Sequence, residues 1–235
     1  MTTSPKMSVL AWNPTYRLVP SRYPPVGLFD RVANADDLDV VFAIEAVTNP
    51  RLRDEIGEIQ LVARSDRVVG EGSSAVMAAF CHLNPDGSRF SDGTWGVYYG
   101  ASSLGVAVAE VSYHRANFLR ATAQLPMDID MRCYVGHVTK PLHDLRPDAW
   151  RHVHHPDDYA APQALAKRLR AEDAWGVVFH SVRSPGGECV GVFRPNGVDL
   201  PVKQGVHVSL RWDGSTVCDW YRKSNATPLT IVPKH

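Results

Sequence analysis

The sequence lacks an excess of either charge. Its 25 lysine and arginine residues balance 25 aspartate and glutamate residues, so the formal net charge is zero. No block of like charge stands out, although a protein that neutralises many phosphates of a nucleic acid normally carries one. We therefore expect no direct nucleic-acid ligand.

Long apolar runs are also missing. A transmembrane helix needs about 18 or more apolar residues in a row, and the sequence contains no such stretch. The opening residues, MTTSPKMSVLAWNP, lack the positively charged segment and apolar run of a secretory signal. We expect a soluble, cytoplasmic protein without a membrane-spanning segment.

Cysteine is scarce and widely spaced. The four cysteines include no C-x-x-C pair of the kind used for zinc binding or thiol exchange. A disulfide framework is typical of much smaller secreted chains, so we expect all four to be reduced. They are Cys81, Cys133, Cys189 and Cys218.

A histidine-rich segment, RHVHHPDD, is the only stretch that suggests a metal ion. His152, His154 and His155 stand near two aspartates, and alternate histidines could share a strand face. Pro156 interrupts the segment, however, and no distant partner motif accompanies it. We interpret it as a polar loop and expect no metal site.

Periodicity predicts helices and strands in the first half of the chain. Five prolines in the first 30 residues indicate an irregular lead-in. We then expect a helix from Asn34 or Asp36 to Pro50, a strand in EIQLVA from Glu58, and a short helix from Ser73 or Ser74. The segment TWGVYYG predicts a strand, and Ser102 or Ser103 is expected to cap the helix that follows.

The second half predicts more strands than helices. We expect a strand from Met131, a helix in APQALAKRLRAED, and a strand in AWGVVFHSVR that pairs antiparallel with ECVGVFRP. A hairpin is expected to turn at Asp213 and Gly214. These elements predict one α+β domain over residues 1–235, mostly antiparallel, with a lead-in to about residue 15 and a C-terminal β extension from about residue 196.

One segment, RFSDGTWGVYYGASSLGVAVAEVSYHR, combines charged and aromatic residues with a small-residue helix. Apolar residues recur every three or four positions from Leu104, which leaves Glu110 on the flank of a buried face. Tyr98 and Tyr99 must point to opposite faces of their strand, so at most one of them faces a site. His114 lies one helical turn beyond Glu110.

Three separated segments together resemble the RES-domain family, which is named for an arginine, a glutamate and a serine. In chain order they are YRLVPSRYPP, RFSDGTWGVYYGASSLGVAVAE and VVFHSVRSPGGECVGVFRP. The similarity covers most of residues 16–195, and three segments in the right order are more specific than one short motif.

The residues that match the family motif are spread over two of these segments. The chain departs from many members by having Phe90 and SDG in place of Trp-Asn-Pro-Pro, and by a long segment before the serine. The matches are Arg89, Phe90, Tyr99, Glu110 and, for the serine, Ser181.

The resemblance implies an ADP-ribosyltransferase-like fold and an NAD-degrading toxin that pairs with an Xre-type helix-turn-helix antitoxin. Glu110 would stabilise the cationic ribose, with Arg89 and Ser181 as further catalytic residues. Arg89 and Arg17 would bind the diphosphate, Tyr99 would stack on nicotinamide or ribose, and Ser181 would orient one of them. NAD is then the substrate, with inorganic phosphate as co-substrate, and no cofactor or metal is needed.

Several alternatives stay open at this point. The acceptor of the ribosyl group is phosphate, water, or a protein or small molecule that becomes ADP-ribosylated, and a non-catalytic nucleotide- or partner-binding module is a further alternative. A strand serine often only satisfies a backbone group. We interpret His114, His180 and Arg183 as packing residues, and we leave a homodimer open.

Overall fold

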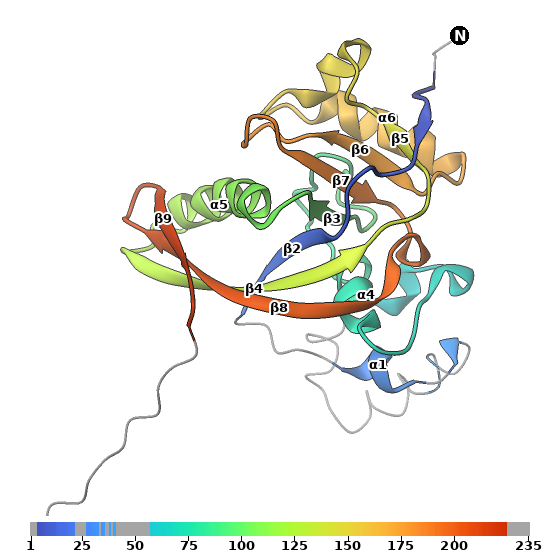
Figure 1. The fold of residues 1–235 in the computed structure, drawn as a ribbon, viewed down its shortest axis with the longest axis horizontal. Coiled ribbons are helices and arrows are strands. Elements are labelled where there is room, and N and C mark those ends of the chain that lie inside the picture. The colour runs from blue at the N-terminus through green and yellow to red at the C-terminus, as the bar shows by residue number, and fades with distance from the viewer. Residues whose placement is uncertain are drawn as a thin grey trace, which may run out of the picture.

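A computed structural model describes residues 4–21, 27–32, 34, 35, 38, 40 and 57–224 (Figure 1). The helix expected from Asn34 or Asp36 to Pro50 falls largely outside these residues, and so does the end of the C-terminal extension. Within the described ranges, no helix is both long and apolar enough to cross a membrane.

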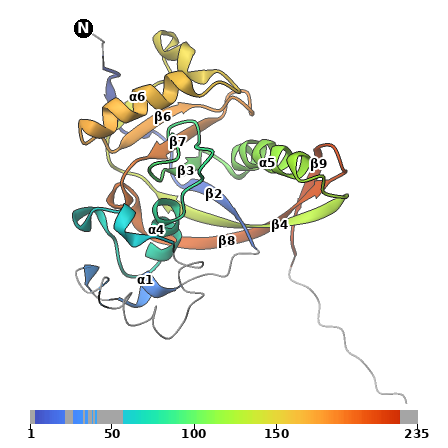
Figure 2. The same ribbon diagram turned by 180° about the vertical axis from the view of Figure 1, so that it is seen from behind.

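A nine-stranded sheet forms the centre of the described structure (Figures 1 and 2). Its strand order is β1-β5-β6-β7-β3-β2-β4-β8-β9, and every pairing is antiparallel except β5 with β6. The expected α+β fold with mostly antiparallel strands is confirmed. The strands are β1 (Met7–Ser8), β2 (Thr15–Pro20), β3 (Tyr98–Ala101), β4 (Met127–His137), β5 (Leu142–Asp144), β6 (Gly176–His180), β7 (Glu188–Val192), β8 (Asp199–Trp212) and β9 (Val217–Arg222).

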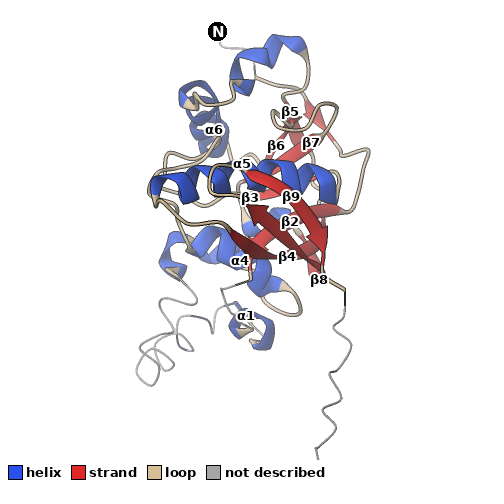
Figure 3. Ribbon diagram, turned by 90° about the vertical axis from the view of Figure 1, so that its left-hand side faces the viewer, coloured by secondary structure: helices blue, strands red, loops and turns tan. Residues whose placement is uncertain are grey.

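Helices cover both faces of this sheet. The longest described helix, α5, contacts β2, β3 and β9, as Figure 3 shows. Alternation along β6 explains the two layers: Val177 and Phe179 pack in the core under α5 and α6, whereas Val178 packs with α4 on the opposite face. The described helices are α1 (Leu28–Arg31), α4 (Ser73–Cys81), α5 (Leu104–Ala121) and α6 (Ala160–Ala171), and the short 3-10 helices are η2 (Ile59–Leu61), η3 (Arg64–Asp66), η4 (Asp148–His154) and η5 (Pro195–Gly197).

Local signals place the start of α5 and the end of β8. Ser103 is the N-cap of α5, and its Oγ accepts a hydrogen bond from the backbone N–H of Val106 at 3.2 Å. The β8–β9 hairpin turns as predicted, because Oδ1 of Asp213 accepts from the N–H groups of Ser215 and Thr216, and Gly214 adopts φ +101°.

The strand expected from Glu58 is wrong, because this segment forms the 3-10 helix η2. Ile59 and Val62 lie three residues apart, and a 3-10 turn brings both of them into the core. Arg67 stabilises the turn by donating to the carbonyls of Val62 and Ile59 at 3.1 and 3.4 Å. The alternation of apolar and polar residues in EIQLVA therefore belongs to a 3-10 turn and not to a strand.

The N-terminal lead-in is more regular than its prolines indicate, since it contains β1 and β2. Pro14 and Pro20 stand at the ends of β2, where the missing N–H group disrupts the ladder least. β2 lies between β3 and β4, and this central position carries Arg17 into the middle of the sheet.

The histidine-rich segment expected to be a polar loop forms most of η4, with Val153 fully buried. Among the residues that the structure describes, no group of three or more histidine, cysteine, aspartate or glutamate side chains could hold a metal ion. All four cysteines are free, and only Cys218 is exposed.

The cap of α5 gives a first prediction. Ser103→Ala removes the side-chain oxygen that accepts from the backbone N–H of Val106, which has no acceptor within the helix. We therefore expect the free energy of unfolding to fall by about 1 kcal/mol in urea titrations. Ser103→Asp keeps a capping oxygen and should stay within about 0.5 kcal/mol of the wild type. Equal stability of the alanine variant and the wild type would show that this cap does not stabilise α5.

Candidate active site

A pocket of about 160 Å³ lies where β2, β3 and α5 meet. Four of the five predicted site residues line it, and the fifth, Ser181, reaches its glutamate by a hydrogen bond. The lining residues are Tyr16, Arg17, Leu18, Ser88, Arg89, Tyr99, Gly100, Ala101, Ala107, Glu110, Val111, His114, Tyr159, Phe179 and Cys189.

Glu110 and Ser181 form a direct pair, although 70 residues separate them in the sequence. The Ser181 hydroxyl donates to Oε1 of Glu110 at 2.6 Å. Its oxygen accepts from the backbone N–H groups of Arg183 at 3.2 Å and Ser184 at 2.9 Å. The oxygen of Ser181 thus accepts two hydrogen bonds, and its single hydrogen is donated to Glu110.

The turn after β6 brings Ser181 to α5. The N–H of Ser181 donates to the carbonyl of Gly187 at 2.8 Å, which closes the turn. A Cβ at Gly187 would lie only 2.6 Å from Cγ2 of Val106, so glycine allows this turn to pack directly on α5. The close contact sets the distance between the serine and the glutamate.

Arg89 is buried at the other side of the pocket, with 7% of its surface exposed. Its Nη1 donates to the carbonyls of Val153 at 3.1 Å and His155 at 2.8 Å. The centre of its guanidinium lies 4.8 Å from the ring centroid of Tyr159. The histidine-rich segment thus holds the arginine in place through its backbone.

Arg17 lines the same pocket from β2, and the central carbon of its guanidinium lies 5.0 Å from the ring centroid of Tyr98. Its Nη1 donates to the carbonyl of Tyr99 at 3.3 Å, and its Nε is buried without a hydrogen-bond partner. Burial lowers the pKa of Arg17 from its ordinary value, because charge is disfavoured away from water. In the part of the chain that the structure describes, neither Arg17 nor Arg89 has a carboxylate within ion-pair distance.

The two adjacent tyrosines face opposite sides of β3, as alternation requires. Tyr98 is fully buried in the core on the α4 side, whereas Tyr99 lines the pocket. The Tyr99 hydroxyl pairs with Oγ of Ser88 at 2.8 Å and accepts from the N–H of Phe90 at 2.9 Å. Burial raises its pKa to about 12. Tyr99 therefore anchors the loop on which Arg89 stands.

Sequence reasoning missed several residues of this pocket. Tyr159 lies outside every matched segment and reaches the pocket only through the packing of α6, so no local signal marks it. His114, which the sequence led us to interpret as a packing residue, lines the pocket, and its spacing of four residues from Glu110 is the signal that points to it.

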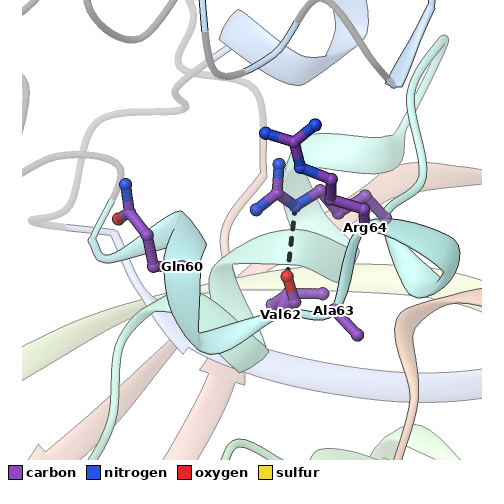
Figure 4. Close-up of a pocket in the computed structure, with 5 residues that line it drawn as sticks. Gln60, Val62, Ala63 and Arg64 are labelled. Atoms are coloured by element: carbon purple, nitrogen blue, oxygen red, sulfur yellow. Dashed lines mark hydrogen bonds between the residues drawn. The ribbon is translucent and has the colours of Figure 1, made fainter.

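A second, separate groove lies on η2 and η3 (Figure 4). Arg67 contributes to it and donates from Nε to the Val62 carbonyl, the bond drawn as a dashed line. None of the predicted site residues lines this groove, which is formed by Gln60, Val62, Ala63, Arg64 and Arg67. The pocket beside Glu110 is therefore the candidate active site.

His154 supports the segment that holds Arg89, and it does so as a neutral ring. Its Nε2 accepts from the backbone N–H of His180 at 3.2 Å, so its proton lies on Nδ1, which donates to the carbonyl of Trp150 at 3.1 Å. Burial lowers the pKa of His154 from its ordinary value of 6.5, and the nearby Arg89 acts in the same direction.

The chain is similar to known proteins in sequence and in fold. The family model described as the RES domain matches residues 64–213. A protein of Sinorhizobium fredii named "Uncharacterized protein y4oC" is 31% identical over 214 residues, which cover 90% of this chain and 88% of that protein. The crystal structure of the M. tuberculosis MbcT-MbcA toxin-antitoxin complex contains a chain similar at a TM-score of 0.42 and 12% identity, with 88% of each chain covered.

The neutral state of His154 gives a prediction for pH dependence. An unfolded histidine takes up a proton near pH 6.5, whereas the folded ring resists protonation, so stability is present above this pH and is lost as the pH falls. His154→Gln cannot titrate, and we expect its free energy of unfolding to fall less between about pH 7 and pH 5 than that of the wild type. Urea titrations at these pH values measure the difference.

A His154→Gln slope parallel to that of the wild type would show that this ring does not resist protonation in the folded protein.

Proposed function

The chain belongs to the RES-domain family, and from this premise we propose that it is an enzyme that consumes NAD by breaking the bond between nicotinamide and ribose. The observation that best supports the proposal is the 2.6 Å hydrogen bond from Ser181 to Glu110 beside a pocket that also contains Arg17 and Arg89. A carboxylate held by a serine suits a reaction that develops positive charge on a sugar.

The charge balance of the pocket favours an anionic substrate. Two arginines and one glutamate are among the residues that line the pocket, and the glutamate already accepts a hydrogen bond from Ser181. A guanidinium has five N–H donors, and the carbonyls of Val153 and His155 use only Nη1 of Arg89. We assign the remaining donors of Arg89 to the diphosphate of NAD, with Arg17 as a second cation at the edge of the same pocket.

Cleavage of the bond between nicotinamide and ribose requires no general acid at the leaving group. When the bond from the anomeric carbon to nicotinamide breaks, its electron pair goes to the positively charged ring nitrogen, and nicotinamide leaves as a neutral molecule without a proton from a general acid. Positive charge develops on the ribose, and the Glu110 carboxylate stabilises it electrostatically. Ser181 holds one carboxylate oxygen, which leaves the other for a ribose hydroxyl.

Tyr99 can act on the substrate only through its ring, because Ser88 and Phe90 occupy its hydroxyl. We therefore assign it stacking against the cationic nicotinamide or the ribose edge.

Inorganic phosphate is the acceptor that we propose. A phosphate oxygen forms a bond to the anomeric carbon as nicotinamide leaves, and the products are nicotinamide and ADP-ribose 1″-phosphate. With water as acceptor the products are nicotinamide, ADP-ribose and a proton. With a protein or small-molecule acceptor, ADP-ribose appears attached to that molecule.

Product analysis tests this proposal directly. We expect the purified protein to release nicotinamide from NAD and, with phosphate present, to form ADP-ribose 1″-phosphate, both identified by mass spectrometry. Glu110→Gln removes the charge and keeps the shape, so we expect kcat/KM to fall by about 100-fold or more.

The control for this test is Glu172→Gln, which changes an exposed carboxylate after the end of α6 and should keep full activity. Nicotinamide release by Glu110→Gln at the wild-type rate would contradict the assigned role of the glutamate. Free ADP-ribose that does not depend on phosphate would replace phosphorolysis with hydrolysis.

We further propose that the chain is a toxin that acts on NAD in the cytoplasm and pairs with an Xre-type helix-turn-helix antitoxin, as its family membership suggests. Expression of the chain alone in bacteria should lower cellular NAD and arrest growth, and Glu110→Gln should relieve both effects. Normal growth and normal NAD in cells that contain soluble, enzymatically active protein would contradict the toxin role.

A further inference from the structure

A short segment reaches the pocket at Tyr159 and carries the partners of Arg89. This strap, residues 153–159, runs from the end of η4 to the start of α6. It holds Arg89 through the carbonyls of Val153 and His155, and Tyr159 at its end stacks on the same guanidinium. The position of Arg89 therefore depends on where the strap lies.

Arg183 docks the strap from the turn that follows β6. Its Nη2 donates to the carbonyl of Pro156 at 2.6 Å and to Oδ1 of Asp157 at 3.1 Å. The Tyr113 hydroxyl of α5 donates to the same Asp157 oxygen. The central carbon of the Arg183 guanidinium lies 3.3 Å from the centroid of the Tyr113 ring.

The backbone of Arg183 reaches the serine. Its N–H donates to Oγ of Ser181 at 3.2 Å and so helps to aim the serine hydrogen at Glu110. One residue thus touches three parts of the site: the turn that carries Ser181, the helix that carries Glu110, and the strap that holds Arg89.

We propose that Arg183 is a positioning residue of the active site, which fixes Arg89 and Ser181 relative to Glu110 by binding the strap while its guanidinium lies on the Tyr113 ring of α5. The proposal rests on the proposed NAD-consuming function for its kinetic readout, but the docking of the strap can be measured without it. A lysine cannot replace this residue fully, because only a guanidinium is planar, stacks on a ring and donates in several directions at once.

Burial separates a positioning role from a merely stabilising one. The Asp157 side chain is 63% exposed, so water screens its pairing with Arg183 and the pair alone stabilises the fold little. The Arg183 side chain is only 16% exposed, but Pro156, whose carbonyl accepts its other bond, is an exposed residue, so this bond also adds little to global stability. Its loss should therefore displace the strap more than it lowers global stability.

The chain offers a matched control in Arg194. Like Arg183, it pairs with an aspartate, Asp66 at 2.6 Å, and stacks on an aromatic ring, Trp175 at 4.9 Å. Its side chain is 23% exposed, and it does not line the pocket. Arg194→Met removes an ion pair and a ring contact of the same kinds, but outside the proposed site.

The test compares Arg183→Met with Arg194→Met in two measurements. Kinetics with NAD should show a fall in kcat of about tenfold or more for Arg183→Met, because small displacements of reacting groups are costly, and wild-type kcat for Arg194→Met. Hydrogen exchange followed by mass spectrometry should show faster exchange in residues 153–159 for Arg183→Met alone. If Arg183→Met does not fold, Arg183→Lys and Arg194→Lys carry the same comparison.

Equal kcat in the two variants, or unchanged exchange of the strap in Arg183→Met, would overturn the proposal. A wild-type protein that releases no nicotinamide would instead contradict the proposed function. In that case hydrogen exchange alone still decides whether Arg183 docks the strap, so the two failures are distinguishable.

Discussion

The hydrogen bond from Ser181 to Glu110 is the contact on which the site depends, because it joins two halves of the chain that reach the pocket independently. Glu110 arrives on α5, whose start is capped by Ser103 and whose buried face packs on β2 and β3. Ser181 arrives on a turn after β6 that packs on α5 at Gly187. The direction of the bond is fixed, since backbone N–H groups occupy the serine oxygen and leave its hydrogen for the carboxylate.

The two arginines of the pocket are the reason for proposing an anionic substrate. A folded protein seldom buries an arginine without a carboxylate partner, because an unpaired charge away from water is unfavourable. This pocket contains Arg17 and Arg89, and the described structure places no carboxylate within ion-pair distance of either. Backbone carbonyls satisfy part of their donors, and a bound diphosphate would satisfy more. The geometry and the family membership therefore favour the same class of substrate.

Local sequence signals predicted much of the fold and named residues that meet at one pocket, but they could not supply the contacts between these residues. A capping serine, a turn at Asp213 and the alternation of Tyr98 and Tyr99 are decided by neighbouring residues, and each is found as expected. The positions of the strap and of Tyr159 depend on how η4 and α6 pack on distant segments. A short stretch of sequence contains no information on such contacts. The expected strand at Glu58 failed for the same reason, since two apolar residues three positions apart also fit a 3-10 turn against the core.

The most direct test of the central claim is a crystal structure of the protein with carba-NAD, an analogue in which carbon replaces the ribose ring oxygen so that the bond to nicotinamide is stable. The account predicts the nicotinamide-bearing ring beside Glu110, with a ring hydroxyl within hydrogen-bond distance of the carboxylate and the diphosphate on Arg17 and Arg89. A dinucleotide bound in the groove of Arg64 and Arg67, or one in the pocket with its ribose turned away from Glu110, would contradict it.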